Sequence, residues 1–181
     1  MKSFVSLILC ACLLFLLGCD DDSYRHAHSD YSYDHHAYPD LRGFNIIDSN
    51  GLSSELAAGS PLIIDPAINS GMFEFYWYVD SHSDYYVALY VNDSPSLNGS
   101  TKISDDICGY THSCDESGLQ ICEYSNDFYL GCGIDSYDVE RNAVDVAHLL
   151  TGVPDTLYFT LEVCDLFATD CEISSLPVQM Y

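Results

Sequence analysis

The chain has 181 residues, of which 48% are hydrophobic, and its 28 acidic side chains against 5 Lys and Arg give a formal charge of −23. This apolar fraction argues against a wholly disordered chain and fits one globular domain with processing segments. The negative charge excludes nucleic acid as a partner, because phosphate backbones are bound mainly through Lys and Arg. It also opposes adsorption to anionic lipid head groups, so any membrane attachment should be hydrophobic or covalent.

The first 19 residues have the layout of a secretory signal peptide, with Lys2, an apolar run at 4–17, and then Gly18 and Cys19. The apolar run is too short for a full bilayer span. The ending Leu-Leu-Gly-Cys resembles the lipobox of bacterial lipoproteins, which implies removal of residues 1–18 and acylation of Cys19. We therefore expect a protein anchored by lipid to a membrane of the cell envelope and facing the periplasm. An ordinary signal peptide or a short anchor helix is the alternative.

Residues 19–42 form the predicted tether between lipid and domain. They are rich in Asp, His, Tyr and Ser, with no aliphatic side chain larger than Ala before Leu41, so they cannot bury enough apolar surface to offset their ordering entropy. The tether should reach roughly 25 Å as a coil and at most about 80 Å when extended. Asp20 directly after Cys19 resembles a signal for inner-membrane retention in some bacteria. The rule varies, so inner and outer membrane both stay open.

Four tether histidines could bind a divalent transition metal, because imidazole and the neighbouring carboxylates suit such ions. These are His26, His28, His35 and His36. Their spacing does not define a tetrahedral site, so a hydrophilic, pH-responsive spacer is the alternative. No cofactor is expected.

From residue 43 to 181, short apolar runs alternate with Ser, Asn, Asp, Gly and Pro clusters, which predicts one all-β domain. The predicted strands are 44–48, 61–65, 72–80, 85–92, 119–123, 128–134, 157–165 and 171–180. Alternation predicts that two sets of side chains face the core. They are Phe73, Phe75, Trp77, Val79 in one strand and Leu157, Phe159, Leu161, Val163 in another. Asp145 is expected to begin a short helical turn that connects two sheets.

Residues 149–165, LLTGVPDTLYFTLEVCD, resemble the corner between the fifth and sixth strands of fibronectin type III and related immunoglobulin-like domains. The strand around Trp77 and the following strand 85–92 are similar to the second and third strands of that fold. The resemblance implies an antiparallel β-sandwich in which Tyr158 is the corner tyrosine. A disulfide-bearing hairpin insertion at 102–134 is expected in addition. A fold of this kind does not specify a function.

Six cysteines lie beyond Cys19, and an even number in an exported chain indicates disulfides. Opposed positions in two hairpins favour two local pairs, which leaves the third by default. The expected pairs are Cys122–Cys132, Cys164–Cys171 and Cys108–Cys114. A zinc site is the competing interpretation, but the chain contains no Cys-x-x-Cys pair.

The chain contains no recognisable catalytic motif, so we expect a non-enzymatic protein that binds an envelope protein or another envelope component. The acidic charge favours a cationic or metal-bridged partner. We place the binding surface on the 102–134 insertion, with Tyr110 and Tyr124 exposed; the alternative is that the insertion only covers a sheet edge. The second hypothesis is a metal-handling or cryptic enzymatic lipoprotein. Convergence of His112 with the acids at 105, 106, 115 and 116 in a pocket would favour it.

Overall fold

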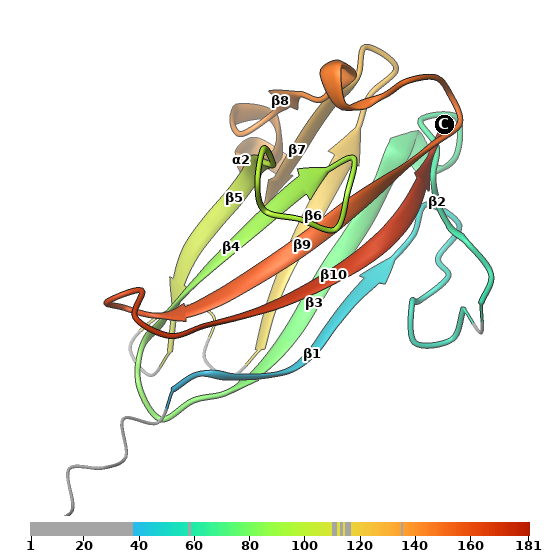
Figure 1. Ribbon diagram of the computed structural model, residues 1–181. Helices are drawn as coiled ribbons and strands as arrows, with labels where there is room; N and C mark the ends of the chain where they lie inside the picture. The colour runs from blue at the N-terminus through green and yellow to red at the C-terminus, as the bar shows by residue number, and fades with distance from the viewer. Residues whose placement is uncertain (1–37, 58, 110–111, 113, 115–116, 135) are drawn as a thin grey trace, which may run out of the picture. The chain divides into compact units, whose positions relative to one another are not determined.

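The computed structural model describes residues 38–57, 59–109, 112, 114, 117–134 and 136–181 (Figure 1). The predicted signal segment, Cys19 and the tether up to residue 37 lie outside these ranges. Among the described residues, no helix has the length and apolar character needed to cross a membrane.

The described strands form two five-stranded sheets that face each other (Figure 1). Sheet A has the order β1 (Asp40–Ile47), β3 (Met72–Asp80), β6 (Ser117–Tyr124), β7 (Tyr129–Gly133), β8 (Val144–Asp145). Sheet B has the order β2 (Leu62–Ile64), β10 (Cys171–Met180), β9 (Asp155–Asp165), β4 (Tyr85–Asn92), β5 (Thr101–Cys108). The shorter elements are the helix α2 (Ser136–Arg141) and the 3-10 turns η2 (Asn69–Gly71) and η3 (Ala147–Leu149). The all-β prediction is confirmed, but the expectation of purely antiparallel sheets is wrong, because β2 runs parallel to β10.

The core lies between the two sheets and follows the predicted alternation. The four inward residues expected in β3 and the four expected in β9 are each at most 3% exposed. Phe159 of β9 packs against Phe73 and Phe75 of β3, with ring centroids 5.7 and 5.0 Å apart. These aromatic contacts join the sheets into one β-sandwich core.

Two disulfides close hairpins in the predicted register. Cys122 lies opposite Cys132 in the β6–β7 hairpin, and Cys164 lies opposite Cys171 in the β9–β10 hairpin. Their Cα atoms are 4.2 and 4.1 Å apart. Both pairings are confirmed.

The predicted connection between the sheets is also present. Asp145 accepts a hydrogen bond through Oδ1 from the N–H of Ala147 at 2.9 Å, and η3 follows. The chain then passes from β8 in sheet A to β9 in sheet B.

Strand β5, at the edge of sheet B, is not predicted by the sequence. It pairs with β4, while β6 lies in the middle of sheet A, so the prediction that residues 102–134 are an insertion is wrong. In β5 only Ile103 and Cys108 are buried, and the strand carries Lys102, Asp105 and Asp106. An edge strand needs no regular apolar alternation, and charges protect it from unwanted pairing. The sequence of β5 therefore has the polar pattern that is typical of a loop.

Strand β1 starts at Asp40, four residues before the predicted strand 44–48. The guanidinium of Arg42 lies 2.6 Å from a carboxylate oxygen of Asp40 and 3.6 Å from one of Asp80 on the neighbouring strand. This polar start of the strand has no apolar signal that a sequence pattern could detect.

Candidate functional site

A cleft of about 490 Å³ opens at the edge of the sandwich, between β5 of sheet B and the helix α2. The helix packs closely on β7, where a Cβ on Gly131 would collide with the backbone of Val139. We call this cavity the edge cleft. Its lining residues are Lys102, Ile103, Ser104, Asp105, Asp106, Gln120, Cys132, Gly133, Ile134, Asp138, Arg141 and Asn142.

Polar side chains enter the edge cleft at positions that face the inside of the sandwich. Ser104 and Asp106 lie opposite Leu89 and Val87, which are both 2% exposed in the core. Cross-strand partners share one face of a sheet, so the two polar residues also point inward. Gln120 of β6 faces them from sheet A and is 7% exposed. The hydroxyl of Ser104 donates a hydrogen bond to Gln120 Oε1 at 2.5 Å, which links the two sheets.

The amide nitrogen of Gln120 is available to a ligand. It has no hydrogen-bond partner among the described residues, although the side chain is almost fully buried. It is not among the fully buried side-chain atoms that lack a partner, so it is open to solvent in the cleft. A ligand oxygen in the edge cleft would satisfy it.

Two of the three Lys and Arg residues in the described ranges line the edge cleft. Lys102 Nζ lies 2.6 Å from Asp105 Oδ2, and this hydrogen bond raises the pKa of Lys102 and lowers the pKa of Asp105. Arg141, in the last turn of α2, forms no ion pair with any described residue. Its guanidinium can therefore bind a ligand without breaking an existing ion pair. With Asp106 and Asp138, the lining has a formal charge of −1.

A smaller cavity of about 200 Å³ adjoins the edge cleft, because Asp106, Gln120 and Ile134 line both. Trp77 also lines it and is 3% exposed, and its indole N–H has no hydrogen-bond partner among the described residues. Gly118 lies against the indole ring, and a Cβ there would collide with it. The indole nitrogen itself is fully buried, so its N–H is an unsatisfied polar group of the core rather than a donor open to the cavity.

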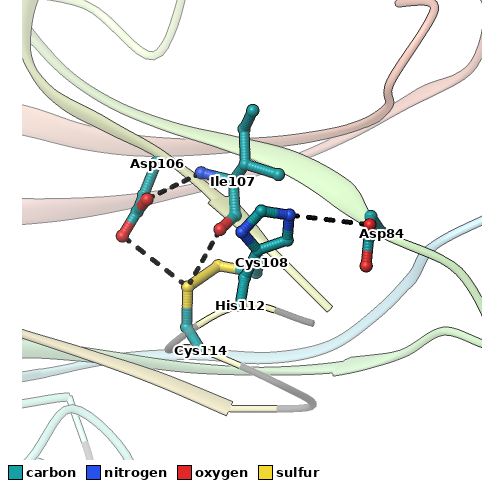
Figure 2. Close-up of a disulfide and its surroundings, with 6 residues drawn as sticks. All are labelled: Asp84, Asp106, Ile107, Cys108, His112 and Cys114. Carbon is teal, nitrogen blue, oxygen red and sulfur yellow. Dashed lines mark hydrogen bonds and ion pairs between the residues drawn. A yellow bond between two sulfur atoms is a disulfide. The ribbon is translucent and has the colours of Figure 1, made fainter. Parts of the chain in front are cut away.

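Figure 2 shows the disulfide loop that follows β5. The pair Cys108–Cys114 closes it as expected, with Cα atoms 4.6 Å apart. His112 Nε2 lies 3.5 Å from Asp84 Oδ2, at the turn before β4. Asp106 approaches the disulfide from the other side, with Oδ2 3.8 Å from the sulfur of Cys114. Cys114 lines the smaller adjoining cavity, whereas His112 lies against Asp84.

The acidic group predicted around His112 forms only in part. Asp105 and Asp106 line the edge cleft, whereas His112 does not. Residues 115 and 116 lie outside the described ranges. The described members of the group therefore do not make the convergent acid–base or metal site that would favour an enzyme.

Tyr124 is a core residue, so the prediction that it is exposed is wrong. It is 0% exposed at the end of β6, its ring centroid lies 6.5 Å from that of Phe128, and burial raises its pKa. The register of β6 turns its even-numbered residues inward and leaves Leu119 51% exposed on the outside. The other proposed binding residue, Tyr110, lies outside the described ranges.

The predicted metal ligands of the tether, His26, His28, His35 and His36, also lie outside the described ranges, so metal binding there stays a prediction. Within those ranges, one group of three possible ligands lies close together: Glu162, Cys164 and Cys171. The two cysteines are joined in a disulfide and supply no thiolate, so this group is not a metal site.

Comparison with known proteins gives no relative: no family model, no curated protein and no solved structure matches this chain. The functional argument therefore rests on the fold, the edge cleft and the N-terminal sequence.

Proposed function

We propose that the protein is a non-enzymatic, lipid-anchored component of a bacterial cell envelope, which uses the edge cleft to bind a protein or another envelope component. The anchoring part rests on the lipobox-like residues 16–19 and on the signal-peptide layout before them. The binding part rests on the cleft. The proposed periplasmic location is supported by the signal-peptide layout and by the three disulfides, since disulfides persist in oxidising compartments.

The observation that carries the binding proposal is the inward-facing polar group at an open edge of the core. Inner positions of a sandwich are usually apolar, and departures from such a pattern are concentrated at functional sites. Here Ser104, Asp106 and Gln120 occupy inner positions and open into a cavity within the usual range of ligand sites, about 300–1,000 Å³.

The partner should be cationic or overall neutral. Without residues 1–18, the chain has four basic residues against 28 acids, a formal charge of −24, which repels anions. The cleft itself offers the carboxylate of Asp106 as an acceptor, with the amide of Gln120 and the guanidinium of Arg141 as donors. Association with a cationic partner should weaken as salt rises.

We further propose that the domain is related to immunoglobulin-like sandwiches. The order β10-β9-β4-β5 supports this, because it matches strands G-F-C-C′ of the variable type. Sheet A departs from that topology. In immunoglobulin-like domains its order is A-B-E-D, so the strand next to B comes later in the chain than its outer neighbour. Here β6, the strand next to β3, comes before its outer neighbour β7. Tyr158, the expected corner tyrosine, is half-buried on the opposite face of β9 from Leu157 and Phe159.

The proposed binding site is tested by changing the unpaired guanidinium. The lipidated protein is used to recover partners from its own envelope, and Arg141→Gln is compared with Arg42→Gln, which makes the same change in charge away from the cleft. A charged hydrogen bond contributes about 1.5–3 kcal/mol, so Arg141→Gln should reduce recovery of the partner about tenfold or more. Equal recovery with both variants would show that the cleft is not the site.

The anchoring part has its own test, which does not depend on the cleft. Cys19→Ser should abolish incorporation of labelled fatty acid, because no acyl acceptor remains at the end of the lipobox-like segment. Labelling that persists in the Cys19→Ser protein would contradict the anchoring proposal. Deleting residues 104–118 is unsuitable as a test of binding, since it removes most of β5.

A further inference from the structure

The turn between β9 and β10 presents apolar side chains to solvent. We call residues 166–170 the hairpin tip. Phe167 is 85% exposed, more than any other large hydrophobic residue in the described ranges, and Leu166 is 50% exposed. Ile173, shortly after the tip on β10, is 55% exposed. Exposed apolar residues that are grouped in this way often mark a surface that contacts another phase or partner.

The hairpin tip is held in shape by covalent and hydrogen bonds. The Cys164–Cys171 disulfide closes its base. Asp165 accepts hydrogen bonds through Oδ1 from the N–H of Thr169 at 2.7 Å, and through its carbonyl from the N–H of Ala168 at 2.9 Å. The N–H of Asp165 in turn donates to the carbonyl of Asp170 at 3.0 Å. These bonds fix the turn in a form that points Phe167 away from the domain.

The hairpin tip lies at the same end of the sandwich as the beginning of β1 (Figure 1). The N–H of Leu41 donates a hydrogen bond to Glu172 Oε2 at 2.7 Å, so the first residues of the domain are beside the first residues of β10. The chain that leads to Cys19 therefore joins the domain next to the hairpin tip. Only 20 residues separate Cys19 from Asp40, and they span at most about 70 Å.

We propose that the hairpin tip inserts Leu166 and Phe167 into the interfacial layer of the bilayer to which the chain is anchored; this inference rests on the anchoring at Cys19 proposed above. Two apolar side chains alone bind a bilayer weakly. The lipid anchor converts their contact into an intramolecular event at high effective concentration. Phe167 is the most exposed large hydrophobic side chain in the described ranges, and Leu166, Ile173 and Tyr38, which is the first described residue, are each at least half exposed.

The charges around the hairpin tip determine which bilayer suits it and how deep it goes. Asp165, Asp170 and Glu172 flank the apolar pair and must stay in water, so insertion is confined to the head-group boundary. The same carboxylates oppose anionic lipid. The expected surface is therefore a bilayer of zwitterionic lipid.

The test measures the depth of the tip in vesicles of phosphatidylcholine that contain acyl-brominated lipid, which quenches indole fluorescence on contact. The lipidated protein carries Phe167→Trp, and the matched control carries Leu56→Trp. Leu56 is 76% exposed in the loop after the opposite end of β1. Trp77 is buried and contributes the same background to both. We expect quenching at least twofold greater for Phe167→Trp than for Leu56→Trp. Equal quenching of the two variants would overturn the insertion.

A second arm separates this inference from the anchoring on which it rests. In the chain that begins at Cys19, the other six cysteines are in disulfides, so Cys19 can be coupled specifically to a maleimide lipid. If the coupled protein shows strong quenching at the tip but the cellular protein carries no acyl group, the natural anchor is wrong and the insertion stands. If the cellular protein is acylated but neither preparation shows greater quenching at the tip, the anchor stands and the insertion is wrong.

Discussion

Single residues in β6 show where an apolar pattern misleads. Gln120 is 7% exposed and Leu119 is 51% exposed, the reverse of what their polarity suggests. The reason is register: Cys122 lies in the core, 0% exposed, and every second residue of the strand faces the same way. Tyr124 is carried into the core in the same way. A tyrosine beside acidic residues in the sequence gives no indication of this.

We predict that Tyr124→Phe does not destabilise the domain. The buried hydroxyl of Tyr124 has no hydrogen-bond partner among the described residues, so its removal breaks no bond and relieves a desolvation cost. The free energy of unfolding in urea, with disulfides intact, should stay the same or increase by up to about 1 kcal/mol. Tyr129→Phe, at a position 48% exposed, serves as the control and should be neutral. A loss above about 1 kcal/mol for Tyr124→Phe would mean that the hydroxyl is bonded after all.

Strands and hairpins differ in how well the sequence predicts them. β3 and β9 cross the middle of the sandwich, so their alternation is strong and both are predicted with the correct inward residues. Disulfide pairs within hairpins are predictable, because opposed positions in a hairpin are fixed by its turn. β5 is not predictable in this way, since it is an edge strand with polar residues on both faces. Residues of β5 line the edge cleft, so the cleft is not predictable from the sequence either.

We predict that a tyrosine on the outer face of sheet B makes the stability of the domain depend on pH in alkaline solution. Tyr90 of β4 donates its hydroxyl proton to Glu162 of β9 at 3.0 Å. Partial burial, then this hydrogen bond and the nearby carboxylate, raise the pKa of Tyr90 to about 12. In the unfolded chain the pKa of a tyrosine is about 10. The folded state therefore binds this proton more tightly, and the resulting stabilisation is complete below about pH 10 and is lost as pH rises toward 12.

This is measured by a difference titration of phenolate absorbance between the native protein and Tyr90→Phe. The phenol missing from the variant should be one that ionises near pH 12. Tyr129→Phe gives the comparison for an exposed tyrosine. If the Tyr90→Phe difference curve has its midpoint near 10, the bond to Glu162 does not hold the proton.

For the whole molecule, the dominant feature is charge of one sign. The described residues contain three Lys and Arg side chains, Arg42, Lys102 and Arg141, and two of them lie at the edge cleft. The total charge is visible in the sequence. Its distribution is not, because α2 and β5 meet only in the folded chain. For the same reason no sequence pattern places Arg141 near Gln120 and Ser104.

We predict that the folded domain becomes more stable as sodium chloride is added. Like charges repel across the compact state more than across the unfolded chain, and the screening length falls from about 10 Å at 0.1 M salt to about 3 Å at 1 M. The urea midpoint should therefore increase between these concentrations. The exposed pair Lys102–Asp105 is weakened by the same salt, but such a pair contributes only about 0.2–1 kcal/mol. A midpoint that falls would show that local ion pairs outweigh the overall repulsion.

The parallel pairing of β2 with β10 has a consequence for how the chain is made. Leu62 pairs with Val178, 116 positions later, and the N–H of Tyr181 donates to the carbonyl of Ile64 at 3.0 Å. Ribosomes add about 5–20 residues per second, so β2 waits on the order of 10 s for its partner to be synthesised. During that interval its backbone and its apolar side chains have no native strand to pair with. The growing chain therefore most needs protection from aggregation after residue 62 has been made and before residue 178 has been made.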